Sequence, residues 1–555
     1  MKKANFKGLF SWFTVVFFVA FLVIPLSSNA QLLVDPVEET SEFPESCTSI
    51  QVARLASTDG SVMTAHSCDG NYRMWLNIVP SKTFRDGEMD PVYWGTMHTE
   101  TAWDLRGLTK KGEILPPDQP TYSFMNVCYP CMNEKQLAIG ETTIGGRGEL
   151  YNNEGLFLIE ELQRITLQRT TTAREAIKLI GELVKEYGYG DRGECLTFAD
   201  PKEIWHFEIM GGGPFEVGAV WAAVRIPDDQ VGVSANIPRI STLNLDDPDH
   251  YMASENVFSL AEEMGWYDPG SGEPFKFWEA YSGRRPYSIR EFYILSTLAP
   301  SLNLTMDLEE LPFSVKPDKK VSPQEMMRYY RETYEGTEYD MTQNLLVPSR
   351  SRGRRGETPP QQPTLTKSGA VSPWMSSDLR SLLNALKPNT VQSQRTIAIA
   401  GCSYSQIIQC RDWLPAEIGG VAYFSFDNPG QSPRIPIFAG VLSLPKSFEI
   451  GAQKRFRMDS AAWAFRRANR LSTVNWGRGG PLLMEAIMDF ETRIFDELPV
   501  IEQKALEYYN NNTPGKEAPK YREFLTQYTN DFARAAIDKW KELGDTYWYM
   551  FGRGF

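Results

Sequence analysis

The segment that most restricts the fold begins abruptly at Cys47. Every second residue through 48–52 is β-branched, residues 58–61 (Thr-Asp-Gly-Ser) have turn composition, and residues 62–68 alternate again. Successive side chains of a strand point to opposite faces, so this period of two predicts the two strands of a β-hairpin. Such a hairpin brings Asp69 back to the end of the sheet where Cys47 lies.

Helix-like and strand-like segments follow in an order that favours an α+β fold. Residues 172–175 (Thr-Ala-Arg-Glu) fit a capping box that opens an amphipathic helix ending before Gly188, and residues 153–168 have the same apolar period. The glycine run 211–214 matches no phosphate-binding loop and predicts a hairpin turn. Strands on both sides of two helices indicate helices packed on antiparallel sheet. The strand-like segments are residues 136–141, 195–199, 204–210 and 217–225.

The second half of the chain continues this pattern and ends in helices. Residues 350–363 are basic and proline-rich, which indicates an exposed loop. We expect a main domain over residues 47–470 and a helical region over residues 471–555 packed on it. The strand-like segments are residues 395–400 and 435–442. The helical segments are residues 481–497, which open with a proline, and residues 521–542.

Residues 1–30 have the pattern of a secretory signal peptide, with lysines first, then an apolar stretch, then small residues before Gln31. An uncleaved membrane anchor is the alternative, because the apolar stretch approaches the length of a short spanning helix. No other segment is as long and apolar, so we expect a soluble body exported to the periplasm or the cell exterior of a bacterial-type cell. Residues 31–46 hold five acidic residues, two prolines and no Lys or Arg, which suits a spacer or a removable propeptide.

Charge and cysteine content narrow the class further. The 555 residues hold 57 Lys and Arg against 70 Asp and Glu, a net charge of −13, whereas binding to a phosphate backbone usually needs a basic surface. Seven cysteines are too few for a disulfide scaffold, and their odd number leaves one thiol over if the others pair. If the leftover thiol is Cys47, the cysteines available for pairing are Cys68, Cys128, Cys131, Cys195, Cys402 and Cys410. Cys402 and Cys410 are close enough in sequence to pair across a hairpin.

The common catalytic motifs are absent. Four histidines without HExxH spacing, and a single CxxC at Cys128 and Cys131, argue against a zinc enzyme. In an exported chain these two cysteines favour a disulfide over a redox centre. No GxSxG elbow or Walker-type loop occurs. We therefore expect no metal and no cofactor.

Cys47 remains as the candidate nucleophile, directly after the removable segment. Cleavage after Ser46 would leave Cys47 with a free α-amine, whose ordinary pKa of about 7.7–8.0 suits a base near neutral pH. One residue would then supply both nucleophile and base. The alternative is a Cys47 held in a disulfide.

Three short motifs open the main domain in order: residues 47–52 (Cys-Thr-Ser-Ile-Gln-Val), 57–61 (Ser-Thr-Asp-Gly-Ser) and 65–70 (Ala-His-Ser-Cys-Asp-Gly). Together they resemble the opening of the peptidase family C69 dipeptidases, cysteine N-terminal-nucleophile hydrolases related to the choloylglycine hydrolase and penicillin acylase group. The shared order across residues 47–470 carries the resemblance. It continues through residues 132–143, 205–209, 224–229, 234–239, 334–340, 409–415 and 459–467.

The resemblance implies a four-layer αββα fold, in which two stacked antiparallel sheets lie between helix layers and the nucleophile begins a central strand. It also implies removal of residues 31–46 as a propeptide. By matched position, Asp69 would hold the α-amine of Cys47, and Asn236 would donate its side-chain amide to the oxyanion. From the residues alone, Asp69 is equally a turn residue, and Asn236 can satisfy its own backbone.

Two further positions carry over from the related acylases. Arg290 lies about where they place an active-site arginine, and Thr142 or Thr143 where they supply a second oxyanion contact or a pocket wall. A surface arginine on an amphipathic helix would give the same pattern at Arg290. This chain departs from the family at His66, where relatives commonly have an arginine. His66 is then a substrate-positioning residue that titrates near neutral pH, or a residue that packs in the hairpin.

The expected activity is that of an exported cysteine dipeptidase, which hydrolyses dipeptides or very short peptides through an acyl-enzyme on Cys47. Residues 350–363 replace a Gly-Pro-Phe-containing segment of the family, so substrate preference stays open. One alternative keeps the fold and nucleophile but takes N-acyl amides, such as conjugated bile salts, N-acyl amino acids or penicillin-type substrates. Another is a catalytically silent binding protein. The mature chain is expected to bind a small peptide, and neither nucleic acid nor a membrane.

Overall fold

The structure is a computed structural model that describes residues 46–214, 217–283, 287–349, 364–511 and 519–553. All of these belong to one of the two units into which the chain divides, Ser41–Phe555. The predicted signal peptide, residues 31–45 of the predicted propeptide and the basic loop 350–363 lie outside the described residues.

A seven-stranded antiparallel sheet carries Cys47. Its strands, in spatial order, are β14 (Ser314–Val315), β12 (Val231–Ser234), β1 (Ser46–Val52), β2 (Val62–Asp69), β17 (Cys402–Cys410), β18 (Val421–Phe426) and β19 (Ile435–Phe438). β1 and β2 form the predicted hairpin, with Cys47 opposite Cys68 and Ser46 opposite Asp69. The hairpin lies in the middle of the sheet, so Cys47 has paired strands on both sides of its own.

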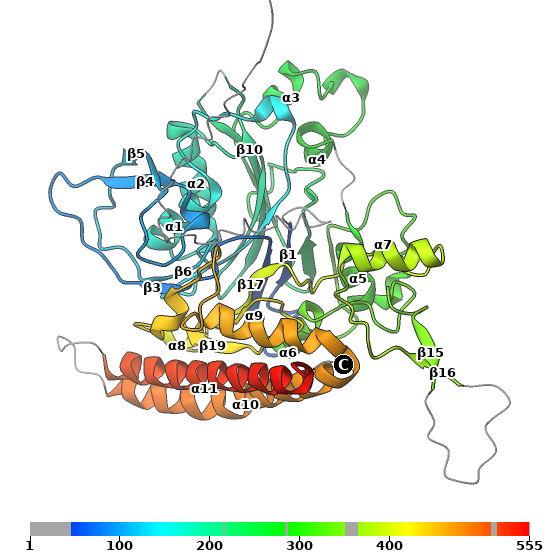
Figure 1. Ribbon diagram of the computed structural model, residues 1–555. Helices are drawn as coiled ribbons and strands as arrows, with labels where there is room; N and C mark the ends of the chain where they lie inside the picture. Colours follow the sequence, from blue (N-terminus) through cyan, green and yellow to red (C-terminus); the bar gives the residue numbers. More distant parts are fainter. Residues whose placement is uncertain (1–45, 215–216, 284–286, 350–363, 512–518, 554–555) are drawn as a thin grey trace, which may run out of the picture. The chain divides into compact units, whose positions relative to one another are not determined.

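An eight-stranded antiparallel sheet lies against the first (Figure 1). Its order is β13 (Tyr251–Ala253), β11 (Ala219–Arg225), β10 (Ile204–Gly211), β9 (Glu194–Ala199), β8 (Ala138–Thr143), β7 (Met132–Asn133), β6 (Phe124–Asn126) and β3 (Asn77–Val79). β8, β9, β10 and β11 confirm the strands predicted at 136–141, 195–199, 204–210 and 217–225. Two smaller ribbons pair β4 (Asp90–Trp94) with β5 (Thr109–Ile114), and β15 (Leu346–Pro348) with β16 (Leu365–Lys367).

The two large sheets meet through polar contacts rather than through apolar side chains alone. Ser49 Oγ on β1 donates to the backbone oxygen of Glu141 on β8 at 3.0 Å, and the hydroxyls of Thr64 and Thr197 are 2.6 Å apart. Gly140 on β8 permits this approach, because a Cβ there would lie 3.1 Å from the Thr64 hydroxyl oxygen and 3.2 Å from the backbone oxygen of Ala65, both on β2 of the facing sheet. The contact places β8 across the hairpin that carries Cys47.

Helices pack on the sheets. α1 (Ile159–Arg169) and α2 (Ala173–Tyr187) contact the eight-stranded sheet, and α2 begins at the predicted capping box of Thr172 and Glu175. α5 (Ile289–Leu298) and α6 (Pro323–Tyr330) contact β12 and β17 of the other sheet. The shorter helices are α3 (Ser259–Glu263), α4 (Phe277–Tyr281), α7 (Ser377–Leu386), α8 (Ala416–Gly419) and the 3-10 turns Thr96–His98, Gly148–Leu150, Pro269–Ser271, Pro300–Leu302, Lys446–Glu449 and Thr473–Asn475.

The C-terminal region is helical, as predicted. α9 (Ala461–Ser472), α10 (Trp476–Asn510) and α11 (Lys520–Phe551) pack on one another, and Figure 1 shows α10 and α11 side by side. The predicted start of α10 is wrong by five residues, because the helix begins at Trp476 and Pro481 lies inside it. Among the described helices, none is long and apolar enough to span a bilayer.

One predicted strand is absent. Residues 395–400 are irregular, and the strand begins only at Cys402. The reason is that other groups take the polar atoms of this segment: Ala398 N donates to the backbone oxygen of Glu332, and Trp374 Nε1 donates to the oxygen of Ala398. The other elements confirm an α+β fold with antiparallel sheets and a C-terminal helical region.

Candidate functional site

Cys47 is the second residue of β1 and is only 1% exposed. Its backbone N–H donates to Oδ1 of Asn236 at 2.8 Å. Asn236 lies two residues beyond the end of β12 and has a φ of 65°. Non-glycine residues seldom adopt this left-handed conformation, although Asn does so more readily than most. The strand pairing and this turn together hold the Asn236 amide against the backbone of Cys47.

Arg290 connects the elements around Cys47. Its guanidinium donates to Oδ1 of Asn236 at 2.9 Å, to the backbone oxygen of Ala235 at 2.8 Å, to Oγ1 of Thr48 at 2.9 Å and to the backbone oxygen of Cys47. The side chain is 4% exposed, so it is not the surface arginine that the sequence pattern left open. Burial lowers the pKa of Arg290 to about 10.

The helix that carries Arg290 is anchored to the same turn. The N-cap of α5 is Ser288, which forms a capping box with Glu291. Oε1 of Glu291 also accepts the backbone N–H of Ala235 at 3.1 Å. A capping box fixes the first turn of a helix, and here its acidic residue also binds the residue before Asn236. The orientation of Arg290 is thereby coupled to the turn at Asn236.

Asp69 lies opposite Ser46, the residue before Cys47. Its Oδ2 accepts hydrogen bonds from Nη2 of Arg395 at 2.6 Å and from the Ser67 hydroxyl at 3.2 Å. Its Oδ1 is buried and has no hydrogen-bond partner among the described residues. Arg395 also donates to the Ser46 hydroxyl at 2.7 Å. One carboxylate oxygen beside the Ser46–Cys47 bond is thus left without a donor.

Thr142 and Thr143 end β8 next to this group. The hydroxyls of Thr142 and Ser234 are 2.5 Å apart, and the backbone oxygen of Thr143 accepts a hydrogen bond from Nδ2 of Asn236 at 2.8 Å. The structure therefore brings Cys47, Asn236 and Thr143 together, with Thr142 bonded to the strand that leads to Asn236.

His66 lies on the same face of the hairpin as Cys47 and is fully buried. Its Nδ1 is 2.6 Å from the backbone oxygen of Glu141. Burial lowers the pKa of His66 to about 4, which favours the second of the two alternatives, a neutral ring that packs in the hairpin. The physical reason is that a charged imidazolium at this depth would lose its hydration.

Glu141 is a residue of the site that the sequence analysis missed. Burial, followed by the neighbouring Cys47 thiol, raises the pKa of this carboxyl well above its usual range. Glu194 on the adjacent strand is also buried, and its pKa is raised in the same way by burial and by Glu141. The available signal was an acidic residue in the apolar strand segment 136–141, since carboxyls are seldom fully buried unless they are paired.

All seven cysteines are buried and unpaired. The predicted disulfides are therefore wrong, and the odd cysteine count does not single out Cys47. Cys402 and Cys410 are the two ends of β17, which places them about 27 Å apart at roughly 3.4 Å per residue, far beyond disulfide reach. Cys128 and Cys131 are both buried in the main core.

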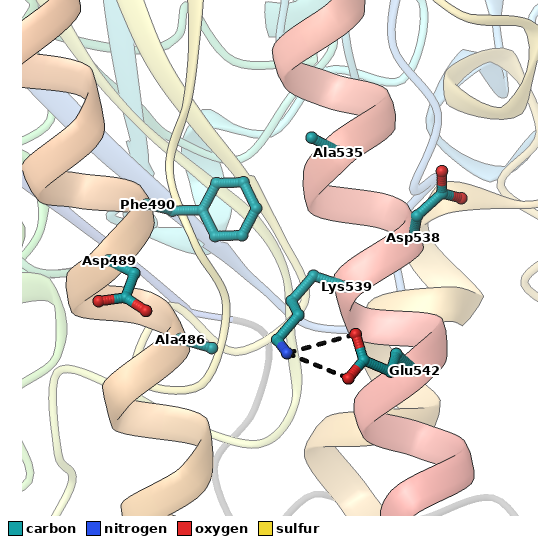
Figure 2. A pocket seen from close by; sticks show the side chains of 7 residues that line it. All are labelled: Ala486, Asp489, Phe490, Ala535, Asp538, Lys539 and Glu542. Atoms are coloured by element: carbon teal, nitrogen blue, oxygen red, sulfur yellow. Dashed lines mark hydrogen bonds and ion pairs between the residues drawn. The ribbon is translucent and has the colours of Figure 1, made fainter.

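Two hollows elsewhere do not include this group. One, of about 340 Å³, is lined by residues that include Arg73, Trp75, Asn126 and Glu160. The other, of about 410 Å³, lies between α10 and α11 and is lined by Ala486, Asp489, Phe490, Ala535, Asp538, Lys539 and Glu542 (Figure 2). The Cys47 group is separate from both.

The structure thus defines an α+β protein with a buried thiol site between two antiparallel sheets. The chain belongs to peptidase family C69, because the model of that family matches residues 46–483. This confirms the resemblance found in the sequence and makes the protein a member of a family of peptidases. The matched region contains every site residue named above.

Curated relatives of the chain include three proteins named as dipeptidases. A probable dipeptidase of Salmonella dublin is 26% identical over 407 residues, which are 71% of this chain and 81% of the relative. A probable dipeptidase of Latilactobacillus sakei is 24% identical over 442 residues, 75% of this chain and 79% of the relative. Dipeptidase A of Lactobacillus helveticus is 23% identical over 452 residues, 79% and 84% respectively.

Proposed function

We propose that this protein is a dipeptidase whose nucleophile is the thiol of Cys47, exposed at a new N-terminus after cleavage of the Ser46–Cys47 bond. The fold would then be the four-layer αββα sandwich of N-terminal-nucleophile hydrolases. The observation that carries the proposal is a set of two acceptors around the Ser46–Cys47 bond: Oδ1 of Asn236 accepts the Cys47 N–H, and the unpartnered Oδ1 belongs to Asp69, which lies opposite Ser46 in the hairpin.

These acceptors suit an α-amine better than a peptide nitrogen. A peptide N–H donates one hydrogen bond, and that bond already goes to Asn236. Cleavage adds hydrogens to the same nitrogen and removes the Ser46 backbone from the space beside Asp69. The carboxylate of Asp69 then accepts a hydrogen bond from the new amine, and this bond orients the amine as the general base.

The reaction follows from that arrangement. The α-amine takes the thiol proton, the sulfur of Cys47 forms a bond to the scissile carbonyl carbon, and the proton passes to the leaving amine as the C–N bond breaks. Water then hydrolyses the thioester and returns the thiol. No cofactor takes part in this scheme.

Asn236 and Arg290 position and stabilise this centre. The amide nitrogen of Asn236 uses one of its two hydrogens in the bond to Thr143. We assign the second hydrogen to the developing oxyanion, where one such donor contributes on the order of 3 kcal/mol. Arg290 holds the Asn236 amide and the Cys47 carbonyl in place. Thr142, Thr143 and His66 form part of the surrounding wall.

Dipeptides are the proposed substrates because three relatives carry that name and because membership of a peptidase family makes amide hydrolysis the parent reaction. The proposal includes export by residues 1–30 to the periplasm or cell exterior, and removal of residues 31–46 as a propeptide. N-acyl amide hydrolysis at the same nucleophile is the competing activity.

Intact-mass analysis and a single substitution test the proposal together. The active protein should begin at Cys47, and Cys47→Ala should lose roughly 10⁴-fold or more of its dipeptide turnover. If cleavage is autocatalytic, Cys47→Ala should also retain the propeptide. Cys131→Ser, a buried thiol outside the group, is the control and should be processed and active. A fully active protein that begins at Gln31 would overturn the mechanism. Activity on acylated amides alone would overturn the substrate.

A further inference from the structure

Three metal-ligating side chains converge beside the nucleophile. One ligand atom from each of Cys47, His66 and Cys68 lies within 4.8 Å of the other two. The hairpin register explains this convergence, since Cys47 is directly opposite Cys68 and Ser49 is directly opposite His66. Opposite residues of an antiparallel pair share a face, as do residues two apart on one strand. The two thiols and the imidazole are therefore held by paired strands rather than by loops.

The imidazole of His66 is already oriented as a ligand. The backbone oxygen of Glu141 is 2.6 Å from Nδ1 and can only accept a hydrogen bond, so it fixes the proton on Nδ1. The Glu141 amide nitrogen lies farther from the same atom, at 3.3 Å. Nε2 consequently carries a lone pair, and it is a fully buried atom without a hydrogen-bond partner among the described residues. Metal-binding histidines are commonly held by such a bond at the other ring nitrogen.

We propose that the sulfurs of Cys47 and Cys68 and Nε2 of His66 form a binding site for a thiophilic divalent ion of the Zn²⁺ class, and that this ion blocks the nucleophile. Two sulfurs and an imidazole nitrogen are ligands that Zn²⁺ prefers. Zinc bonds of about 2.3 Å to sulfur and 2.0–2.1 Å to nitrogen require the distances between the ligand atoms to shorten by about 1 Å. Side-chain torsions supply such a shift.

The binding step balances without a redox partner. One divalent ion displaces a proton from each of the two thiols, forms two metal–thiolate bonds and one bond to Nε2, and releases two protons to solvent. Water can take the fourth position. In a chain cleaved before Cys47, the α-amine of Cys47 takes this fourth coordination position instead of water. The α-amine ligand and the loss of turnover are the two parts of the proposal that rest on the proposed function. A thiolate lone pair shared with the metal does not attack a carbonyl, so the ion acts as a reversible inhibitor.

Cobalt spectroscopy tests the site without any substrate. Reduced full-length protein titrated with Co²⁺ under argon should give sulfur-to-cobalt charge-transfer and tetrahedral d–d absorption that saturates at one ion per chain. Prior alkylation of Cys47 with iodoacetamide, confirmed by peptide mapping, should abolish the signal. Absence of the charge-transfer band, or a band that alkylation leaves unchanged, would overturn the proposal.

Substitutions identify the other ligands. Cys68→Ser and His66→Asn should each weaken Co²⁺ affinity roughly ten-fold or more, since even second-shell changes cost about that much. Cys410→Ser is the matched control, because Cys410, the last residue of β17, is equally buried but donates to the backbone oxygen of Gln136 in the turn between β7 and β8. Equal affinity of Cys68→Ser and the control would remove Cys68 from the site. If the variants do not fold, the alkylation result on the unsubstituted protein decides.

Inhibition separates this proposal from the proposed function. Zn²⁺ should stop dipeptide hydrolysis by the unsubstituted protein, EDTA should restore it, and Cys68→Ser should need at least ten-fold more Zn²⁺ for the same fractional loss of its own rate. A cobalt signal in a protein that hydrolyses no dipeptide would refute the function and keep the site. Hydrolysis that is indifferent to Zn²⁺, with no cobalt signal, would refute the site and keep the function.

Discussion

The sheet interface around Cys47 and the C-terminal helices are both buried, yet they are built from different side chains. Around Cys47 the buried groups include two carboxyls, Glu141 and Glu194, and the guanidinium of Arg290. Between the C-terminal helices the buried side chains are mainly apolar, and they include ring pairs such as Phe490 with Phe532, whose centroids are 5.5 Å apart. One region holds groups that cost stability to bury, and the other holds groups that gain it.

From this difference we expect the proposed activity to depend mainly on the first region and the stability of the fold mainly on the second. Polar groups are kept inside a protein when a site needs them preorganised, and perturbed pKa values gather there for the same reason. The helices instead cover the outer strand β19, where the Thr529 hydroxyl of α11 donates to the backbone oxygen of Pro436 at 3.0 Å. Substitutions in the two regions should therefore separate turnover from stability.

Arg290→Lys gives the largest effect expected within this comparison. A lysine ammonium is a point donor and cannot reproduce the fork that reaches Cys47, Thr48 and Asn236. We expect kcat/KM for a dipeptide to fall on the order of 10²–10³-fold, as when one preorganised donor is lost. Steady-state kinetics on protein that intact-mass analysis shows to be fully processed measures this effect.

Arg434→Lys is the matched control for Arg290→Lys. Arg434 is 1% exposed, and burial lowers its pKa to about 10 as well, but its guanidinium donates to Ser405 rather than to the Cys47 group. Its substitution should lower the melting temperature and leave kcat/KM per folded molecule within a few-fold. Equal losses of kcat/KM in the two variants would show that Arg290 acts through general packing.

The parts of this fold that were predicted from the sequence are those that local patterns encode. The β1–β2 hairpin follows from alternation and a turn, and α2 begins at its capping box at Thr172. The family resemblance located Asn236 and Arg290, which periodicity alone does not. Arg290 contacts Cys47 across 243 residues of sequence, and no local signal reports such a pairing.

The predictions that failed did so where tertiary contacts override local preference. Residues 395–400 have strand-like composition, but Arg395 donates to Asp69 and Ser46, and the backbone N–H of Ala398 donates to Glu332 instead of to a neighbouring strand. The disulfides were expected from compartment alone, whereas all seven thiols are unpaired and Cys402 and Cys410 lie at opposite ends of one strand, β17. Glu141 was missed because a single acidic residue in a strand does not reveal what it faces.

Trp540→Ala tests the helical side of the comparison. Trp540 is fully buried, its Nε1 donates to Asn469 at 3.0 Å, and its ring lies 5.5 Å from that of Phe465. The truncation should lower the free energy of unfolding by about 4 kcal/mol, as large aromatic deletions do, and leave kcat per folded molecule unchanged. Urea denaturation and active-site titration of Cys47 measure the two quantities.

Trp548→Ala controls for the change of residue type in α11. Trp548 lies on the same helix but is 64% exposed, so its loss should change the free energy of unfolding by no more than about 0.5 kcal/mol. If Trp540→Ala lowers kcat as much as it lowers stability, the helices and the site are one cooperative region, and the division drawn above is wrong.

Glu160→Gln gives the smallest of the three effects and asks whether buried carboxyls make stability depend on pH. Glu160 on α1 is 2% exposed, and burial, followed by the charge of Asp191, raises its pKa to about 8 from an ordinary 4.5. The folded protein therefore keeps a proton that the unfolded chain releases above pH 4.5. The stabilisation is complete below pH 4.5 and is lost as the pH rises toward 8.

The pH dependence follows from that sign. Between pH 5 and pH 8 the unsubstituted protein should lose about 3 kcal/mol of unfolding free energy relative to Glu160→Gln, because each pKa unit corresponds to about 1.36 kcal/mol. Urea denaturation at the two pH values measures the difference, and Glu182→Gln, at an exposed position of α2, is the control. If the difference in unfolding free energy between the unsubstituted protein and Glu160→Gln is the same at pH 5 and at pH 8, burial does not raise the pKa of this carboxyl.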